Sequence, residues 1–228
     1  MKNIGRNQKN RNNKKKRGVF ITFEGVEGSG KTLQAGLLYK WLKTKGFDVC
    51  LTKEPGGTKI GEKIRKILLK GESKINKYTE LFLYLADRAS HLTEVIEPNL
   101  NKNKIVISDR YFDSTFAYQG VGRGINENEI ELLKKLSLFS KREPDITFLL
   151  DVDPAIAKNR IKKPDRIEKE PLRFHRKVRK AYLKIAKGNP GRVVLINARG
   201  SIEETHKKIK EKIIDFLGEE FNGEKKEI

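Results

Sequence analysis

The chain has 228 residues and carries 50 Lys or Arg against 30 Asp or Glu, a formal net charge of +20. This length fits one compact domain with a substantial core. A single cysteine, Cys50, excludes a disulfide framework and a Cys-rich metal site, and no stretch approaches the ~20 apolar residues that cross a bilayer. We therefore expect a cytoplasmic protein that makes no membrane contact.

The basic excess is concentrated at the N-terminus. Residues 1–17 hold eight Lys or Arg and no acid, without apolar periodicity. Such a segment buries too little apolar surface to offset its ordering entropy, so we predict a disordered leader. It is either a solvated tail or a non-specific, salt-sensitive contact with nucleic acid, which we do not expect to serve the function. Residues 218–228 are interpreted as a charged tail.

Short apolar runs along the chain predict five strands, namely Val19–Phe23, Asp48–Lys53, Ile105–Ser108, Ile146–Val152 and Arg192–Ile196. Amphipathic segments between and after them predict helices over Lys31–Lys45, Ile60–Lys70, Thr79–Leu100, Asn126–Ser140, Ala155–Lys162, Leu172–Lys187 and Ile202–Leu217. Strands that alternate with helices favour a parallel sheet covered on both faces. The charged segment at about 158–171 has little apolar content and is predicted to be a mobile surface lid.

The strongest motif lies between the first strand and the first helix. Residues 25–32 read Gly25, Val26, Glu27, Gly28, Ser29, Gly30, Lys31 and Thr32, which matches G-x-x-x-x-G-K-[ST] completely. Glycines let successive N–H groups and the helix N-terminus point at phosphate oxygens. Lys31 is then expected to reach the β- and γ-phosphates of ATP, and Thr32 to bind Mg²⁺. The fold class is thus an α/β P-loop NTPase, with three α/β/α layers, a five-stranded parallel sheet and a lid. The loop alone leaves a kinase, a GTPase and an ATPase motor open.

Further motifs follow the predicted strands, at the edge where open α/β sheets bind ligands. Residues 54–58 read Glu-Pro-Gly-Gly-Thr after the second strand, and Asp109, Arg110 and Tyr111 follow the third. Tyr84 and Arg88 share one face of a helix at i, i+4. These pieces, in this order, resemble the bacterial and archaeal thymidylate kinases over residues 18–217. The resemblance implies an enzyme that phosphorylates dTMP to dTDP with ATP and Mg²⁺ for dTTP synthesis, and that forms a homodimer.

The same resemblance implies roles for the residues around the acceptor. Tyr84 stacks on thymine and Arg88 donates to its O4, a position where cytosine presents a donor instead. Arg110 clamps the dTMP phosphate, Asp109 organises Arg110 and the hydrated Mg²⁺, and Glu27 faces the acceptor sugar or a metal-bound water. The remaining members of the predicted acceptor pocket are Pro55, Ser114, Thr115, Tyr118 and Gln119, with Tyr118 expected to exclude a ribose 2′-hydroxyl.

Catalytic positive charge is expected from the lid. Gly28 stands where some family members carry an arginine in the phosphate loop, so we assign this charge to Arg160 and Arg166, with Lys162 and Lys163 as alternatives. Residues 197–200 are predicted to flank the adenine. One departure from the family pattern is Lys53, which replaces an arginine and lacks its planar fork.

Two rival interpretations remain at this point, because the complete set of Lys31, Thr32, Asp109 and Arg110 argues against a third, a regulatory ATP-binding protein without catalysis. The first keeps the chemistry and changes the acceptor to another nucleoside monophosphate or a deoxynucleoside. The second is an NTPase that uses the basic leader to bind nucleic acid. An assay across acceptors separates the first from dTMP phosphorylation, and deletion of residues 1–17 tests the second.

Overall fold

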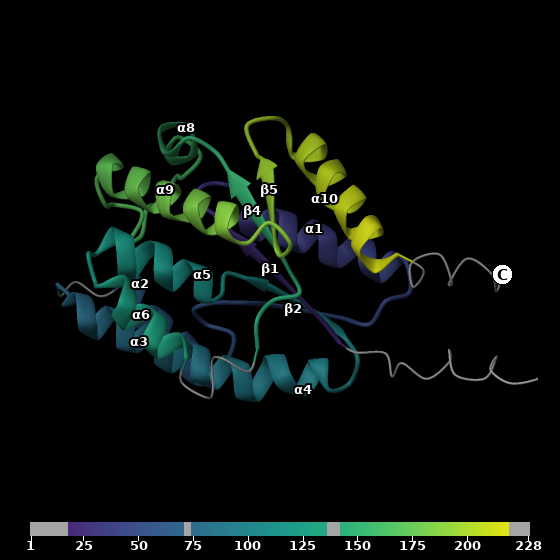
Figure 1. Cartoon of the computed structure of the whole chain (residues 1–228), viewed down its shortest axis with the longest axis horizontal. Helices are drawn as coiled ribbons and strands as arrows, with labels where there is room; N and C mark the ends of the chain where they lie inside the picture. The colour runs from purple at the N-terminus through teal and green to yellow at the C-terminus, as the bar shows by residue number, and fades with distance from the viewer. Residues whose placement is uncertain (1–17, 71–73, 136–141, 219–228) are drawn as a thin grey trace, which may run out of the picture.

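The structure is a computed structural model that describes residues 18–70, 74–135 and 142–218. In these ranges five parallel strands form one sheet in the order β2-β3-β1-β4-β5 (Figure 1). The strands are β1 (Val19–Glu24), β2 (Val49–Lys53), β3 (Ile105–Asp109), β4 (Ile146–Asp151) and β5 (Val193–Asn197). The predicted three-layer α/β fold with a five-stranded parallel sheet is confirmed.

Helices cover both faces of the sheet, and alternate residues of β1 show how the faces divide. Ile21 and Phe23 pack with α1 (Lys31–Thr44) and α10 (Ile202–Leu217) in one core cluster. Phe20 points to the other face, where it packs with α3 (Lys77–His91) and α4 (Glu97–Leu100). On that same face α9 (Leu172–Gly188) covers β4. Burial on both faces is what the uninterrupted apolar runs of the strands predict.

The remaining helical segments of the described residues are mostly short. They are α2 (Lys59–Lys70), the π-helix η1 (Leu92–Ile96), α5 (Phe112–Thr115), the π-helix η2 (Phe116–Gly122), α6 (Glu127–Lys134) and α8 (Pro154–Lys158). The predicted helix 79–100 is therefore α3, η1 and α4 in succession. It starts earlier than predicted because the Asn76 side chain caps the Tyr78 N–H at 2.8 Å.

Two helix predictions differ from the structure. The helix predicted to reach Lys162 ends at Lys158, where the chain closes into three-residue turns: Arg160 N–H donates to Ala157 O and Ile161 N–H to Lys158 O. The prediction for 126–140 holds over α6, but residues 136–141 lie outside the described part. The leader 1–17 and all of the charged tail except Gly218 also lie outside it.

The predicted lid, residues 158–171, follows α8 and leads into α9. Asp165 shapes its turn, because the Asp165 carboxylate accepts from the N–H groups of Ile167 and Glu168 at 2.8 and 2.9 Å. Across the ranges described, no helix has the length and apolar content that a bilayer crossing requires.

Candidate active site

The loop between β1 and α1 forms one wall of a large cavity. Its glycines take backbone conformations that side chains rarely adopt, with φ of 73° at Gly28 and 97° at Gly30. A Cβ on Gly28 would also lie 2.2 Å from the carbonyl oxygen of Ala157 in α8. The loop therefore needs glycine at this position for its close packing as well as for its turn. The cavity has a volume of about 880 Å³ and is lined by residues 27–34 of the loop and α1.

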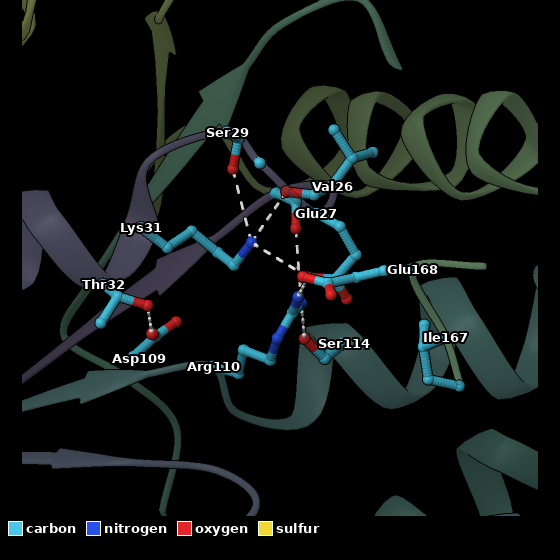
Figure 2. A network of polar contacts seen from close by, with 12 residues as sticks. Val26, Glu27, Ser29, Lys31, Thr32, Asp109, Arg110, Ser114, Ile167 and Glu168 are labelled. Carbon is cyan, nitrogen blue, oxygen red and sulfur yellow. Dashed lines mark hydrogen bonds and ion pairs between the residues drawn. The ribbon is translucent and has the colours of Figure 1, made fainter. Parts of the chain in front are cut away.

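Lys31 bends back over this loop (Figure 2). Its Nζ donates to the carbonyl oxygen of Val26 at 2.8 Å and to Ser29 Oγ at 3.4 Å. The side chain is buried, and burial together with the nearby Arg110 lowers the pKa of Lys31 to about 8. Glu27 Oε2 lies 4.0 Å from Nζ, and a phosphate at this position would add further negative charge beside the buried ammonium.

Arg110 stands opposite the loop in a strained backbone conformation. Its φ is 79°, and two hydrogen bonds fix it: its N–H donates to Phe23 O at 3.0 Å and its carbonyl oxygen accepts from Ser108 Oγ at 2.8 Å. Such strain is typical of functional positions. Arg110 Nη2 pairs with Glu27 Oε2 at 2.6 Å, as Figure 2 shows. Burial opposes ionisation of Glu27, but Arg110 and then Lys31 outweigh it and lower the Glu27 pKa.

The fork of Arg110 has further partners across the sheet edge. Nη1 lies 3.2 Å from Ser114 Oγ and 3.4 Å from the Tyr182 hydroxyl, and the guanidinium stacks 5.1 Å from the Tyr118 ring centroid. Burial works against the charge, yet Glu27 raises the pKa of Arg110 well above its ordinary value. The arginine is thus a fixed, permanently charged fork that faces the cavity.

Thr32 and Asp109 meet beside the loop, where the Thr32 hydroxyl donates to Asp109 Oδ2 (Figure 2). Asp109 Oδ1 is buried and has no hydrogen-bond partner among the described residues. Oxygen donors of this kind suit Mg²⁺, which usually takes one or two protein ligands beside waters and phosphates. The described residues hold no cluster of three or more His, Cys, Asp or Glu, so the pair fits Mg²⁺ and does not fit a metal held by protein ligands alone.

A second and much smaller pocket, with a volume of about 20 Å³, also borders Arg110. It brings together six predicted acceptor residues, namely Tyr84, Arg88, Ser114, Thr115, Tyr118 and Gln119, beside Glu27, Arg110, Glu54 and Ile167. Pro55 lines the larger cavity instead. Burial raises the pKa of the Tyr84 hydroxyl, so the hydroxyl stays neutral, and Tyr84 lines the pocket. The two spaces share five lining residues and meet at their side chains, namely Glu27, Glu54, Tyr84, Arg110 and Ile167.

The lid contributes one of its two predicted arginines to the cavity. Arg160 lines it, with Nη1 3.5 Å from Gly28 O and Nη2 3.3 Å from Ala198 O. Arg166 lies elsewhere, because its Nε donates to Leu68 O at 2.6 Å and its Nη2 pairs with Glu80 at 2.7 Å. Among the described lid residues that line the cavity, Arg160 is the cation, and Lys162 and Lys163 are absent from that lining. Ile167 and Glu168 approach the same site from the lid (Figure 2).

Comparison with known proteins decides the family. A family model described as thymidylate kinase matches residues 23–209. The chain belongs to the thymidylate kinase family. The expectation of a thymidylate kinase, an enzyme that phosphorylates dTMP, is thereby confirmed.

Relatives of this thymidylate kinase match it over most of its length. The thymidylate kinase of Pelobacter propionicus is 47% identical over 197 residues, which cover 82% of this chain and 90% of the relative. That of Halothermothrix orenii is 44% identical over 205 residues, or 86% and 97% of the two chains. The crystal structure of thymidylate kinase from Ehrlichia chaffeensis matches with a TM-score of 0.71 at 35% identity, over 86% of this chain and 98% of that one.

Sequence reasoning missed two buried residues beside Arg110, Glu24 and Tyr182. Glu24 is fully buried behind Arg110, where it accepts from Tyr111 N–H, Ser114 Oγ and the Tyr182 hydroxyl at 2.7–2.8 Å. Burial, and then the charge of Asp113, raises the pKa of Glu24 to about 7. A carboxylate that ends a buried strand beside the phosphate loop was a usable signal. Tyr182 gave none, since it occupies an ordinary apolar position on α9.

Proposed function

We propose that this thymidylate kinase transfers the γ-phosphoryl group of ATP to the phosphate of dTMP at the junction of the two spaces. ATP occupies the cavity along the phosphate loop, and dTMP occupies the pocket of Tyr84 and Arg88. One observation carries the proposal: the 2.6 Å pair of Arg110 and Glu27 stands where the two spaces meet. An acceptor phosphate there faces the end of a triphosphate held on the loop.

The donor side follows from the loop. Its N–H groups and the N-terminus of α1 bind the ATP phosphates, and Lys31 neutralises the oxygens of the transferred group. Thr32 and Asp109 would hold Mg²⁺, which when bound bridges phosphate oxygens and offsets their charge. Residues 197–200 begin at the last residue of β5, and Ala198 and Gly200 line the cavity, which supports the assignment of this segment to the adenine.

The acceptor side follows from the second pocket. Arg110 presents a planar fork that matches phosphate oxygens, and Tyr84 presents a ring face to the base. Arg88 donates to O4 of thymine, whereas cytosine would bring an amino donor to the same place. Glu27 accepts from the acceptor sugar.

The rest of this pocket encloses the acceptor. It is lined by Ser114, Thr115, Tyr118 and Gln119, and the bulk of Tyr118 excludes a ribose 2′-hydroxyl.

The chemistry then depends on alignment and charge. Phosphoryl transfer needs little covalent help, so the protein positions the two phosphates and surrounds the transferred group with cations. Lys31 supplies one of these cations, and Arg160 of the lid supplies a second. Ile167 and Glu168 close the site from the lid side and exclude water, which would otherwise accept the phosphoryl group.

The assembly and its location are also proposed. α2 and α3 pack together and expose Ile67 and Phe82, 51% and 57% accessible, which supports a homodimer. Sedimentation velocity at micromolar concentration tests it, with a dimer expected and a monomer contradicting it. The substrates belong to the nucleotide pool for DNA synthesis, and we place the enzyme in the cytoplasm with that pool.

An acceptor assay tests the proposed function. The purified chain is given ATP and Mg²⁺ with dTMP, dCMP, AMP or thymidine in turn, and ADP formation is coupled to NADH oxidation. We expect dTMP to exceed every other acceptor by at least about tenfold in kcat/KM. A faster reaction with thymidine or AMP would contradict the assignment of the second pocket to dTMP.

A further inference from the structure

A chain of buried polar groups runs from Arg88 and Glu54, which both line the second pocket, to His91 and Thr52. Glu54 Oε2 accepts from Arg88 Nε at 2.8 Å, and Glu54 Oε1 lies 2.9 Å from His91 Nδ1. The other ring nitrogen of His91 lies 2.6 Å from Thr52 Oγ1. The side chains of Arg88, Glu54 and His91 are 1%, 2% and 0% exposed, so water does not compete for these contacts.

The contacts of Arg88 leave little of its guanidinium for a ligand. Nη2 pairs with Glu54 at 2.8 Å and donates to the carbonyl oxygen of Tyr111 at 3.0 Å, while Nη1 donates to Thr115 Oγ1 at 2.7 Å. With Nε also bonded to Glu54, hydrogen bonds occupy three of the five N–H groups of an arginine, and the contact of Nη2 with Glu54 is an ion pair. Nη1 carries a second N–H besides the one bonded to Thr115, and Arg88 lines the second pocket. The direction of that second N–H is therefore set by the bonds behind it.

His91 is held as firmly as the arginine. A carboxylate only accepts hydrogen bonds, so Nδ1 carries a hydrogen and donates it to Glu54. On the other side the ring lies against Gly57, where a Cβ would come within 2.3 Å of His91 Cδ2. The glycine of the Glu-Pro-Gly-Gly-Thr segment thus makes room for the imidazole. Without the His91 donor, one oxygen of a buried carboxylate would lack its partner.

We propose that His91 is a positioning residue for base recognition: through Glu54 it fixes the plane of Arg88 so that one Nη1 hydrogen meets O4 of the acceptor base. This inference rests on the proposed contact between Arg88 and thymine. His91 lies one turn beyond Arg88 on α3 and touches no substrate. It acts by keeping the carboxylate, and hence the fork, in a single orientation.

The test compares two acceptors in one preparation. The readout is the ratio of kcat/KM for dTMP to that for dCMP, which does not change with the fraction of folded enzyme. His91→Phe keeps a ring without donors, and His91→Asn keeps an amide donor near the position of Nδ1. We expect His91→Phe to lower the ratio about tenfold and His91→Asn to restore most of it. The ratio of kcat/KM for dTMP to that for dUMP reports contact with the thymine methyl group. It should stay within about twofold of its value in the unmodified enzyme.

A double-mutant cycle connects the effect to the arginine. Arg88→Ala alone should lower the dTMP to dCMP ratio, and His91→Phe added to it should lower the ratio no further. An unchanged ratio in Arg88→Ala would overturn the proposed function, and this inference with it. A lowered ratio in Arg88→Ala beside an unchanged ratio in His91→Phe would overturn the inference alone, and His91 would then be purely structural.

A second variant covers the case in which His91→Phe does not fold. Glu54→Gln keeps the shape of the side chain and removes the charge that pairs with Arg88. It should lower the dTMP to dCMP ratio by about tenfold as well. A ratio equal to that of the unmodified enzyme would contradict the proposal that His91 positions Arg88 through Glu54.

Discussion

Glu80 joins the lid to the acceptor pocket, and its neutralisation should loosen the lid. The buried carboxylate accepts from Gln119 Nε2 at 2.9 Å and from Arg123 Nε and Nη2 at 3.0 and 3.1 Å. It also pairs with Arg166 of the lid at 2.7 Å. Arg123 in turn pairs with Glu170 at the end of the lid. Two lid residues therefore depend on this carboxylate, directly or through Arg123.

The expected cost of Glu80→Gln follows from this burial. Removal of one partner of a buried ion pair costs about 3–5 kcal/mol, because a charge is left uncompensated. Arg123 and Arg166 retain 17% and 19% exposure and Arg123 keeps Glu170, so solvent screens part of this penalty. We therefore expect the free energy of unfolding to fall by about 2 kcal/mol.

Two measurements check this prediction. Urea denaturation gives the unfolding free energy, and limited trypsin digestion probes the bond after Lys162, a cleavage site in the lid. Cleavage there should accelerate in Glu80→Gln under conditions where the rest of the chain stays intact. The matched control is Glu127→Gln, which breaks an exposed pair with Lys184 and should change stability by less than about 0.5 kcal/mol. Unchanged stability and unchanged lid cleavage in Glu80→Gln would refute the reasoning.

Three further predictions concern the loop, the metal and pH. Lys31→Ala should lower kcat by about 10²-fold or more in the coupled assay, because it removes a cation from the transferred group; an effect confined to KM for ATP would contradict this role. Asp109→Asn should raise the Mg²⁺ concentration needed for half-maximal activity, and an unchanged Mg²⁺ titration would exclude the proposed site. The pKa of Glu24 is raised to about 7 from 4.5, so the folded state keeps a proton that the unfolded state releases. The unfolding free energy should therefore fall as pH rises from about 4.5 to about 7, and this fall should be smaller in Glu24→Gln. If the unfolding free energies of the unmodified enzyme and of Glu24→Gln changed in parallel with pH, the protonation of Glu24 would not be the cause.

The sequence predicted the sheet and the phosphate loop because both depend on local signals. Strands buried on both faces are continuous apolar runs, and β3 and β4 lie within a residue of their predicted ends. The loop is a complete motif between a strand and a helix. Residues after each parallel strand converge at one edge, and from this rule the sequence alone predicts that Asp109 and Arg110 lie beside Lys31.

What the sequence did not predict depends on long-range contacts. α5 and η2 pack against α9 and carry a glycine-rich stretch that reads as a loop. The sequence led to the assignment of Arg166 to catalysis, but in the structure its guanidinium pairs with Glu80, which lies 86 positions earlier in the chain. The contact between Glu54 and His91 has no signal in the sequence, because the two residues are 37 positions apart and only the fold brings them together.

A crystal structure with dTMP and a non-hydrolysable ATP analogue tests the central claim most directly. The account predicts the thymine ring against Tyr84 with O4 on Nη1 of Arg88, the dTMP phosphate on Arg110, and the analogue's phosphates along residues 25–32. A thymine ring bound outside the pocket of Tyr84 and Arg88, with the analogue still on the loop, would contradict it.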